Sequence, residues 1–501
     1  MKTIKTILLA AIAMMAWSVS AQNGDTTNTD GNDSPLPLYK YTAAIESDNI
    51  LKIGSGINTA SKICNYNEDY SIAAVRKTAT QTYFCLIDHS SLNNTLYSPP
   101  SSAPSCSTRY INTKFAGFSS LIVNDMYICS DYLFFCGECI DNSNVKKAVI
   151  GYFNILDLLS SSSSISIYYC TLISSTTAPP VSLRKLVAYI NSAGIYTVVA
   201  IGEDSDGYNY GISKVVEISN ATSNLLPFSC NVADFPRLST SGQVRKVFLD
   251  DIVLTNNNVV ILGREVNVIS TMSNHLWFSI GSKASVVADI CSTSAYNNHY
   301  LAVPYESVDV ATGVALDSNK FGMAYVGHDN SGFYTRFRVI NPTTMTNTYS
   351  QQYLNNEKYN IVEMTYLEDM RRVELLQPLT DSSNFIQLNP YATSPYTSTI
   401  LTPDGKEYFS LNRVLLLSTL TSFISVTNGK IYLQHGDSSV PHSNSSCPSN
   451  SNLSVSIISS LSINNAPKPT AQTNYYNNLQ TDIRSILSNS LNNNCFSYSI
   501  K

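Results

Sequence analysis

Four acidic residues recur at the same place in a repeated sequence pattern. Glu138, Glu203, Glu265 and Asp329 each follow, within two residues, a glycine that ends an apolar, strand-like segment. If the repeats stack around one axis, these carboxylates occupy equivalent positions and form part of a ring on one face. Such a ring could bind a cation or sugar hydroxyls, or supply an acid/base pair. The alternative is that each carboxylate stabilises a tight turn by accepting hydrogen bonds from backbone N–H groups.

The cysteines form the second group with possible chemistry. The chain has 11 cysteines, an odd number, so at least one is unpaired or pairs with another chain. Cys136 and Cys139 form a Cys-x-x-Cys motif at the end of a strand-like segment, whereas redox motifs of this kind open a helix. We therefore expect a structural disulfide or buried thiols there. Cys447 and Cys495 bracket the last part of the chain and are candidates for a second disulfide.

No motif indicates a metal site or a cofactor. The six histidines are scattered, without a His-Glu-x-x-His motif, and the Cys-x-x-Cys lacks the second pair that zinc requires. A Gly-x-Ser-x-Gly nucleophile elbow and a phosphate-binding glycine loop are also absent from the sequence. The sequence thus predicts no metal and no cofactor.

Charge excludes two further classes of function. Charged residues are 13% of the chain, about half the usual share, and the net charge is −5. There are no runs of basic residues. We expect no binding to nucleic acid or to anionic membrane surfaces, because both need a basic footprint.

The N-terminus reads as an export signal. Lys2 and Lys5 precede an apolar stretch from Ile7 to Trp17, and Val19-Ser20-Ala21 supplies the small residues before a cleavage site. The apolar stretch is too short to span a bilayer, and no later stretch is long and apolar enough. Residues 1–21 are therefore predicted to be a signal peptide, and the polar residues 22–38 a disordered leader.

The rest of the chain repeats a hairpin pattern of strand, polar turn, strand, glycine and acid. Each hairpin is followed by a further strand, and another strand candidate lies before it, which makes about four strands per unit. The spacing of roughly 50–65 residues is that of four-stranded units with loop insertions. The clear copies span residues 121–138, 186–203, 250–265 and 308–329, and weaker ones span 72–87, 361–376 and 414–433.

These repeats predict an all-β fold, a β-propeller of about seven four-stranded blades over residues 39–447. One small sheet cannot bury both of its faces alone, whereas sheets stacked around an axis cover each other. A string of β-sandwich domains is the alternative, with pairs of units forming one sandwich. Residues 448–501 are expected to form a short irregular tail. Leu453–Ile463 could close the ring by pairing with an N-terminal strand, and the apolar spacing of residues 483–491 suits a short helix.

Two phrases carry a resemblance to known proteins. Phe134-Phe135-Cys136-Gly137-Glu138 and Val149-Ile150-Gly151-Tyr152-Phe153 resemble segments of uncharacterised exported β-propeller-like proteins of Gram-negative gut and oral bacteria. The resemblance implies the fold and the export, and no established activity. Asp25-Thr26-Thr27 is similar to the acceptor for O-glycosylation in such bacteria, which implies Thr26 as a modification site.

Two functions remain open from the sequence. The first is a non-enzymatic binding or scaffold protein of the periplasm or cell surface, whose partner is a glycan or another cell-surface protein. The second is a glycan-active enzyme, a hydrolase or lyase with carboxylates at the propeller mouth. Fold alone does not separate them, because function depends on the site. An enzyme should gather at least two acids, or an acid with His, Tyr or Arg, in one pocket.

Overall fold

In the residues that it describes, the computed structural model of the chain is almost entirely β-structure. It describes residues 41–46, 59–67, 69–78, 80–88, 106–172, 180–191, 194, 196–205, 209–216, 228–234, 238–240, 243–267, 274–284, 296–301, 307–329, 332–355, 363–367, 372–378, 383–388, 397–401, 408–413, 421–427, 430–435, 449–451, 456–457, 463–465, 470–471, 475–477 and 480–491. The helical elements within these residues are short: α3 (Ile155–Leu159), a 3-10 turn (Asp317–Asn319) and the two residues 283–284. The predicted all-β class is confirmed.

The first large sheet holds two four-stranded units. The first unit is β2 (Thr59–Asn65), β3 (Tyr70–Thr78), β4 (Gln81–Asp88) and β5 (Cys106–Asn112). The second is β6 (Phe118–Cys129), β7 (Tyr132–Asp141), β8 (Lys146–Asn154) and β9 (Ser164–Thr171). All neighbouring strands within each unit are antiparallel. A single parallel pair, Gln81 with Leu121, joins the two units into one sheet.

Four more antiparallel units follow in chain order. They are β10 (Pro180–Ile190), β11 (Tyr196–Asp204), β12 (Asn209–Val216) and β13 (Phe228–Asp234); β15 (Gln243–Leu254), β16 (Asn258–Asn267), β17 (His275–Ser282) and β18 (Tyr296–Leu301), with β14 (Leu238–Thr240) beside β15; β19 (Ser307–Ala315), β20 (Phe321–Asp329), β21 (Gly332–Asn341) and β22 (Thr346–Asn355); and β23 (Glu363–Leu367), β24 (Arg372–Pro378), β25 (Ser383–Leu388) and β26 (Thr397–Leu401).

The two ends of this series meet in the last unit. It contains β27 (Tyr408–Arg413), β28 (Thr421–Thr427) and β29 (Lys430–His435), and its fourth strand is β1 (Tyr41–Glu46), from the start of the described chain. β1 pairs antiparallel with β29. An N-terminal strand therefore does complete a C-terminal sheet, but its partner is β29, and not the segment Leu453–Ile463 that the sequence suggested.

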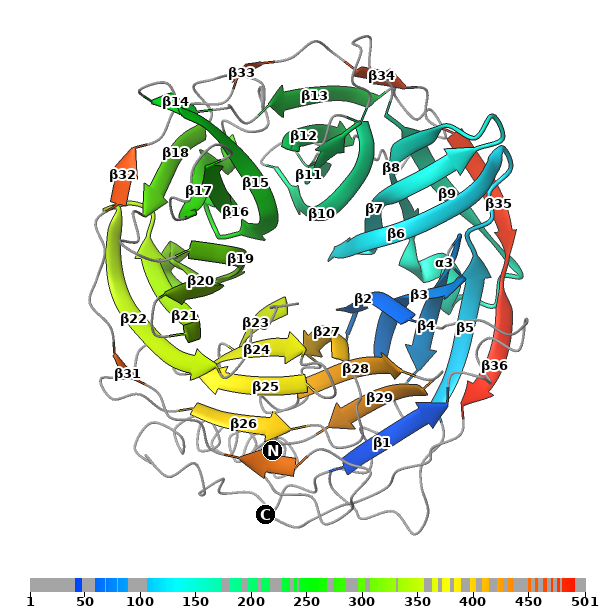
Figure 1. Cartoon of the computed structure of the whole chain (residues 1–501). Helices are drawn as coiled ribbons and strands as arrows, with labels where there is room; N and C mark the ends of the chain where they lie inside the picture. The colour runs from blue at the N-terminus through cyan, green and yellow to red at the C-terminus, as the bar shows by residue number, and fades with distance from the viewer. Residues whose placement is uncertain are drawn as a thin grey trace, which may run out of the picture.

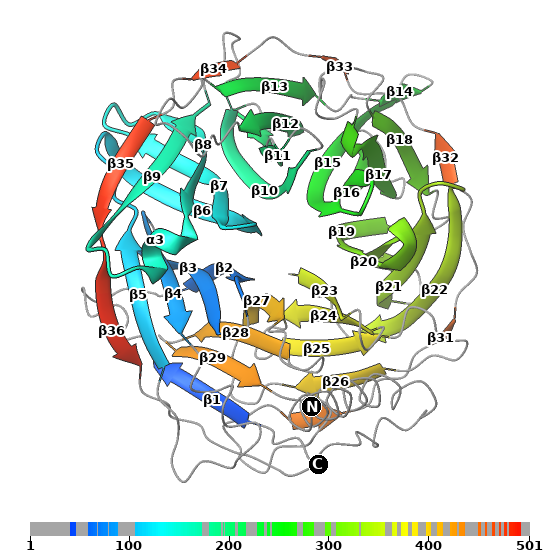
Figure 2. The same ribbon diagram turned by 180° about the vertical axis from the view of Figure 1, so that it is seen from behind.

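The units lie side by side around a common centre (Figures 1 and 2). The first strand of each unit is innermost. These strands contact one another in a cycle, β2 to β6, β10, β15, β19, β23 and β27, and β27 contacts β2. None of the sheets formed by the described strands closes on itself, and the circular arrangement comes from the packing of separate sheets.

The apolar cores lie between neighbouring units. One core joins Phe134, Ile150 and Cys170 of the β6–β9 unit to Leu186 and Ala200 of the next. The following core joins β10 and β11 to β15, β16 and β17, and it contains Trp277, which is fully buried. Each sheet thus buries apolar faces against its neighbours, which is the expected reason for small sheets to assemble.

A β-bulge recurs in the innermost strands. The register shifts by one residue in β2, β6, β10, β15, β19 and β27. In four of these units a glycine of the second strand lies opposite: Gly137, Gly202, Gly263 and Gly327. A Cβ atom on Gly137 would overlap the carbonyl oxygen of Ile122 and lie 2.9 Å from its carbonyl carbon. The glycine of the repeat is therefore required by the bulge, which brings the two backbones close together.

The tail is a series of short strands around the outside of the ring, coloured orange to red in Figure 1. They are β30 (Ser449–Ser451), β31 (Ser456–Ile457), β32 (Ile463–Asn465), β33 (Thr470–Ala471), β34 (Tyr475–Asn477), β35 (Gln480–Ser485) and β36 (Leu487–Leu491). The predicted helix at residues 483–491 is wrong, because edge pairing with β9 and β5 determines the backbone there.

Candidate functional site

The innermost strands enclose a central pocket with a volume of about 390 Å³. Its lining comes from β2, β6, β10, β15, β19 and β23, so residues more than 300 positions apart in the sequence share one wall. Its size is typical of small-molecule sites. This pocket is the candidate site of the protein.

The bulges place charged residues in the pocket wall. Lys62, Asp125, Lys185 and Asp251 each come directly after the bulged residue of β2, β6, β10 and β15, and all four line the pocket. Bulges commonly re-aim a side chain in this way. Lysine and aspartate therefore alternate over four consecutive innermost strands.

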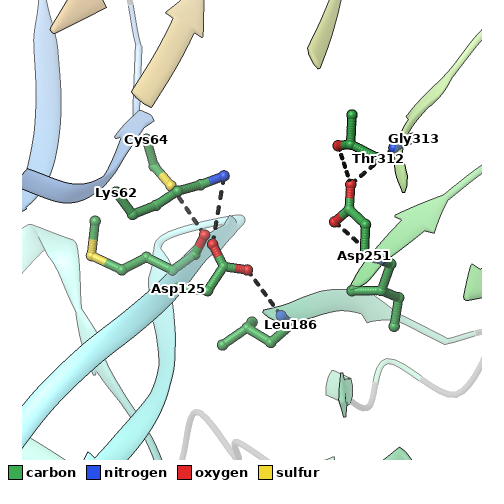
Figure 3. A network of polar contacts seen from close by, with 9 residues as sticks. Lys62, Cys64, Asp125, Leu186, Asp251, Thr312 and Gly313 are labelled. Carbon is green, nitrogen blue, oxygen red and sulfur yellow. Dashed lines mark hydrogen bonds and ion pairs between the residues drawn. The ribbon is translucent and has the colours of Figure 1, made fainter. Parts of the chain in front are cut away.

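Asp125 connects three units (Figure 3). Its Oδ1 lies 3.5 Å from Nζ of Lys62 on β2, and its Oδ2 accepts a hydrogen bond of 2.9 Å from the backbone N–H of Leu186 on β10. The Asp125 side chain is 4% exposed. Oδ1 accepts no hydrogen bond from the described residues, so it retains an acceptor position beside the lysine.

Asp251 makes a similar link between the next pair of units. Its Oδ2 accepts hydrogen bonds from the Thr312 hydroxyl at 2.6 Å and from the Gly313 N–H at 2.9 Å, both on β19 (Figure 3). Its Oδ1 accepts a bond of 2.8 Å from the N–H of Ile252. Three donors therefore satisfy this buried carboxylate, which holds β15 against β19.

Lys185 differs from the other charged residues of the wall. It lines the pocket and is partly buried, and it makes no hydrogen bond or ion pair with any residue that the structure describes. Its ammonium is available to a ligand, together with Oδ1 of Asp125.

The acids predicted from the sequence do not converge on this pocket. Each of the three whose side chains are described has its own basic partner within its own unit. Glu138 forms an ion pair of 2.8 Å with Lys146, Glu203 pairs with Arg184, and the buried Glu265 lies 3.5 Å from Nδ1 of His275. Asp329 is the last residue of β20, and its side chain lies outside the described residues. None of the three acids with described side chains lines the pocket.

The Cys-x-x-Cys motif is a pair of free thiols. Cys136 and Cys139 are three residues apart in β7, and their side chains enter two different cores. Of the two expected outcomes, a structural disulfide or buried thiols, the structure shows buried thiols, because side chains at odd spacing point to opposite faces of a strand. Burial raises the pKa of Cys139 to about 12 and that of Cys136 well above its usual value, so both act as small apolar residues.

Several predicted features lie outside the described residues. These are the signal peptide at 1–21, the leader at 22–38, the modification site at Thr26, and Cys447 and Cys495.

The site residues predicted from the sequence do not include Asp125, Lys185 or Asp251, although the sequence pattern around them is unusual for a strand. Each is the second member of a polar pair inside an apolar strand: Asn124-Asp125, Arg184-Lys185 and Asp250-Asp251. Two consecutive polar residues break the alternation of a strand, as expected where a bulge adds one residue.

Asp250 is the bulged residue of β15, and we expect it to make the free energy of unfolding depend on pH. Its Oδ2 accepts a bond of 3.3 Å from the N–H of Ala311 and lies 3.4 Å from Nε of Arg264. Burial raises the pKa of Asp250 to about 7; Arg264 and Arg184 oppose the shift, and the charge of Asp251 adds to it. The folded state thus favours the protonated form.

Between the ordinary carboxyl pKa of about 4 and pH 7, unfolding releases this proton, so the free energy of unfolding falls as the pH rises. Asp250→Asn is expected to remove this decrease. Urea unfolding of both proteins at pH 5 and pH 8 measures it, and an unchanged difference between the two pH values would contradict the assignment.

Comparisons with known proteins give no match: no protein-family model matches the chain, and no curated protein matches it significantly. Among the described residues, no helix has the length and apolar character needed to cross a membrane. The same part of the chain contains no group of three His, Cys, Asp or Glu side chains that could hold a metal ion.

Proposed function

We propose that this chain is an exported seven-bladed β-propeller that binds a small acidic ligand in its central pocket. The seven blades are the seven four-stranded units, counted by separating β2–β5 from β6–β9 at their single connecting pair. The cycle of contacts among the innermost strands and the closure of the last unit by β1 support this fold. Export is supported by the signal-like pattern of residues 1–21 and by the resemblance stated above.

The binding proposal rests on the position of Lys185 in the pocket wall without an acidic partner among the described residues. Of the four charged residues in the wall, Lys62 is neutralised by Asp125, and Asp251 is fully hydrogen-bonded. Lys185 has no such partner among the described residues. A ligand with an anionic group would pair with this ammonium, and a ligand hydroxyl or amine could donate to Oδ1 of Asp125. A carboxylate next to hydroxyl groups, as in an acidic sugar, has this combination of groups.

Lys185→Gln is expected to weaken the binding of an acidic ligand tenfold to a hundredfold, because a charge-assisted hydrogen bond contributes roughly 1.5–3 kcal/mol. Calorimetric titration with glucuronate and with glucose checks it, since the two probes differ only in the carboxylate. Glucuronate should bind more tightly to the wild-type protein, and Lys185→Gln should remove that preference.

The matched control is Lys146→Gln, which removes a lysine that pairs with Glu138 outside the pocket. It should leave the affinity unchanged. Equal affinities for glucuronate and glucose, or an equal effect of both lysine variants, would contradict the acidic-ligand proposal.

A glycan-active enzyme remains the alternative. The carboxylates that favoured it, Glu138, Glu203 and Glu265, each have a basic partner on their own sheet and do not gather in one pocket. The pocket does hold Asp125 and Asp251, but Asp125 pairs with Lys62 and keeps only Oδ1 as an acceptor, and Asp251 is fully hydrogen-bonded. A reducing-sugar assay on acidic and neutral polysaccharides separates the two functions, and turnover would overturn the binding-protein proposal.

A further inference from the structure

The C-terminal segment pairs with the outer edges of the units in reverse chain order. Its first strand, β30, pairs with β26, and the following strands pair with progressively earlier units until β36 pairs with β5. The full series is β30 with β26, β31 with β22, β32 with β18, β33 and β34 with β13, β35 with β9, and β36 with β5. One segment thus covers the outermost strand of six units, as the orange and red strands show in Figures 1 and 2.

Main-chain pairing is the principal contact of this segment. Each of the strands β30 to β34 forms only two or three residue pairs, whereas β35 forms six and β36 forms five. The side chains of β35 are exposed or half-buried, and Ile483 is 69% exposed. Apart from Ile463 and Ile486, which pack against the margins of two cores, the segment could therefore leave the edges with little change in the cores between the units.

The last two strands are the anchor. Asp482 accepts a hydrogen bond of 3.1 Å from the N–H of Ala116, and the Arg484 guanidinium lies over the ring of Phe115. Ile486 packs against the core of the first two units, and its N–H donates to the carbonyl of Ser163 at 2.8 Å. A peptide held in this way has a defined register at one end and many weak contacts along the rest.

Without the C-terminal segment, the outer edges of the units would be free to pair with other chains. The outer strands β5, β9, β13, β18, β22 and β26 would each present a row of unpaired N–H and C=O groups, which is a template for pairing with another chain. Pairing of this kind depends on the backbone and therefore accepts any extended peptide that fits the edge. The C-terminal segment of a second copy has the same sequence and therefore fits the same edges.

We propose that the outer edges of the six units form a strand-acceptor surface, that residues 449–491 are its intramolecular occupant, and that the same segment of a second copy can replace it. Exchange of an identical element between two copies is a low-cost route to a dimer. The surface thus serves both to protect the monomer and to join copies of this chain.

The test uses the full chain with a protease site inserted between His435 and Ser449. After folding, the chain is cleaved and mixed with a labelled synthetic peptide of residues 449–491. The cleaved segment should co-elute with the body, and the labelled peptide should replace it over time. The uncleaved protein at the same dilute concentration should take up at least tenfold less peptide.

The matched control peptide carries Ile483→Pro and Arg484→Pro, which remove two consecutive backbone donors from β35. It should bind at least tenfold more weakly. Equal binding of both peptides, or equal uptake by cleaved and uncleaved protein, would overturn the proposal. At high concentration the uncut chain should form a dimer whose segments cross-link between copies; a chain that stays monomeric would overturn the exchange.

Hydrogen exchange on the unmodified chain provides a test that needs no variant. The amides of β30–β34 should exchange faster than those of β7 and β16, which lie inside their sheets. Equal protection in both sets would show that the segment opens only when the whole protein unfolds, and the proposal would then be wrong.

Discussion

Gly263→Ala is expected to cost on the order of 3 kcal/mol of stability, because the added methyl group would overlap the carbonyl oxygen of Phe248. It would also lie 3.0 Å from the carbonyl carbon of Phe248 and 3.2 Å from Cα of Leu249. These are backbone atoms of the bulged strand, so no side-chain rotation relieves the contact. β15 and β16 would have to separate, and the wall of the pocket would move with β15. Chemical denaturation measures the loss.

Gly117→Ala is the matched control for this variant. It adds the same methyl group, but no atom lies within 4 Å of the new position. Gly117 has φ of +88°, so its replacement costs only backbone strain, about 1 kcal/mol. Equal losses in the two variants would mean that the close approach of β15 and β16 does not require Gly263.

Asp251→Ala is expected to have the second large effect, a loss of about 2–4 kcal/mol. The substitution leaves the hydroxyl of Thr312 and the N–H groups of Gly313 and Ile252 without their acceptor in a buried position. It also removes the link between β15 and β19. Thermal and urea unfolding of the purified variant measure the loss.

A double-mutant cycle with Thr312→Val separates the link from the general effect of the substitution. The cycle should give a coupling of about 1–3 kcal/mol between Asp251 and Thr312. Asp141→Ala is the control: this aspartate accepts turn hydrogen bonds from Ser143 and Val145 at the surface, and its loss should have a smaller effect. A coupling near zero would contradict the role of Asp251 as a clasp between units.

The sequence predicted the repeated glycine, but it did not predict the charged residues of the pocket. The sequence pattern showed that a glycine recurs in each repeat. It did not show why, because the bulge that requires Gly263 lies on the neighbouring strand β15. The acid after the glycine was taken as the site, whereas the charged residues of the pocket precede it in the inner strand. The spacing of acids along a chain does not reveal which side of a sheet they reach once a bulge has changed the alternation.

The repeats in the sequence also predicted unit boundaries that differ from those of the structure. The strand before each hairpin was expected to belong to the same unit as that hairpin, but β9, which precedes the hairpin β10–β11, pairs with β8 of the preceding unit. Likewise the weaker copies at 72–87 and 414–433 end in third strands, β4 and β29, whereas the clear copy at 121–138 ends in β7, the second strand of its unit. A repeat has a period but no inherent starting point, and hydrogen bonding between strands sets the boundary.

The sequence by itself determined the all-β class, the repeated hairpins and the positions of the glycines, because alternation, turn residues and strand propensity act over a few neighbouring residues. Only the tertiary structure decided that Lys62, Asp125, Lys185 and Asp251 share one pocket, that each predicted acid with a described side chain has a basic partner, and that strands β30 to β36 pair with the outer edges in reverse chain order. These outcomes depend on backbone hydrogen bonds and bulges between segments far apart in the chain. Such pairings become favourable only when the sheets are already packed beside one another.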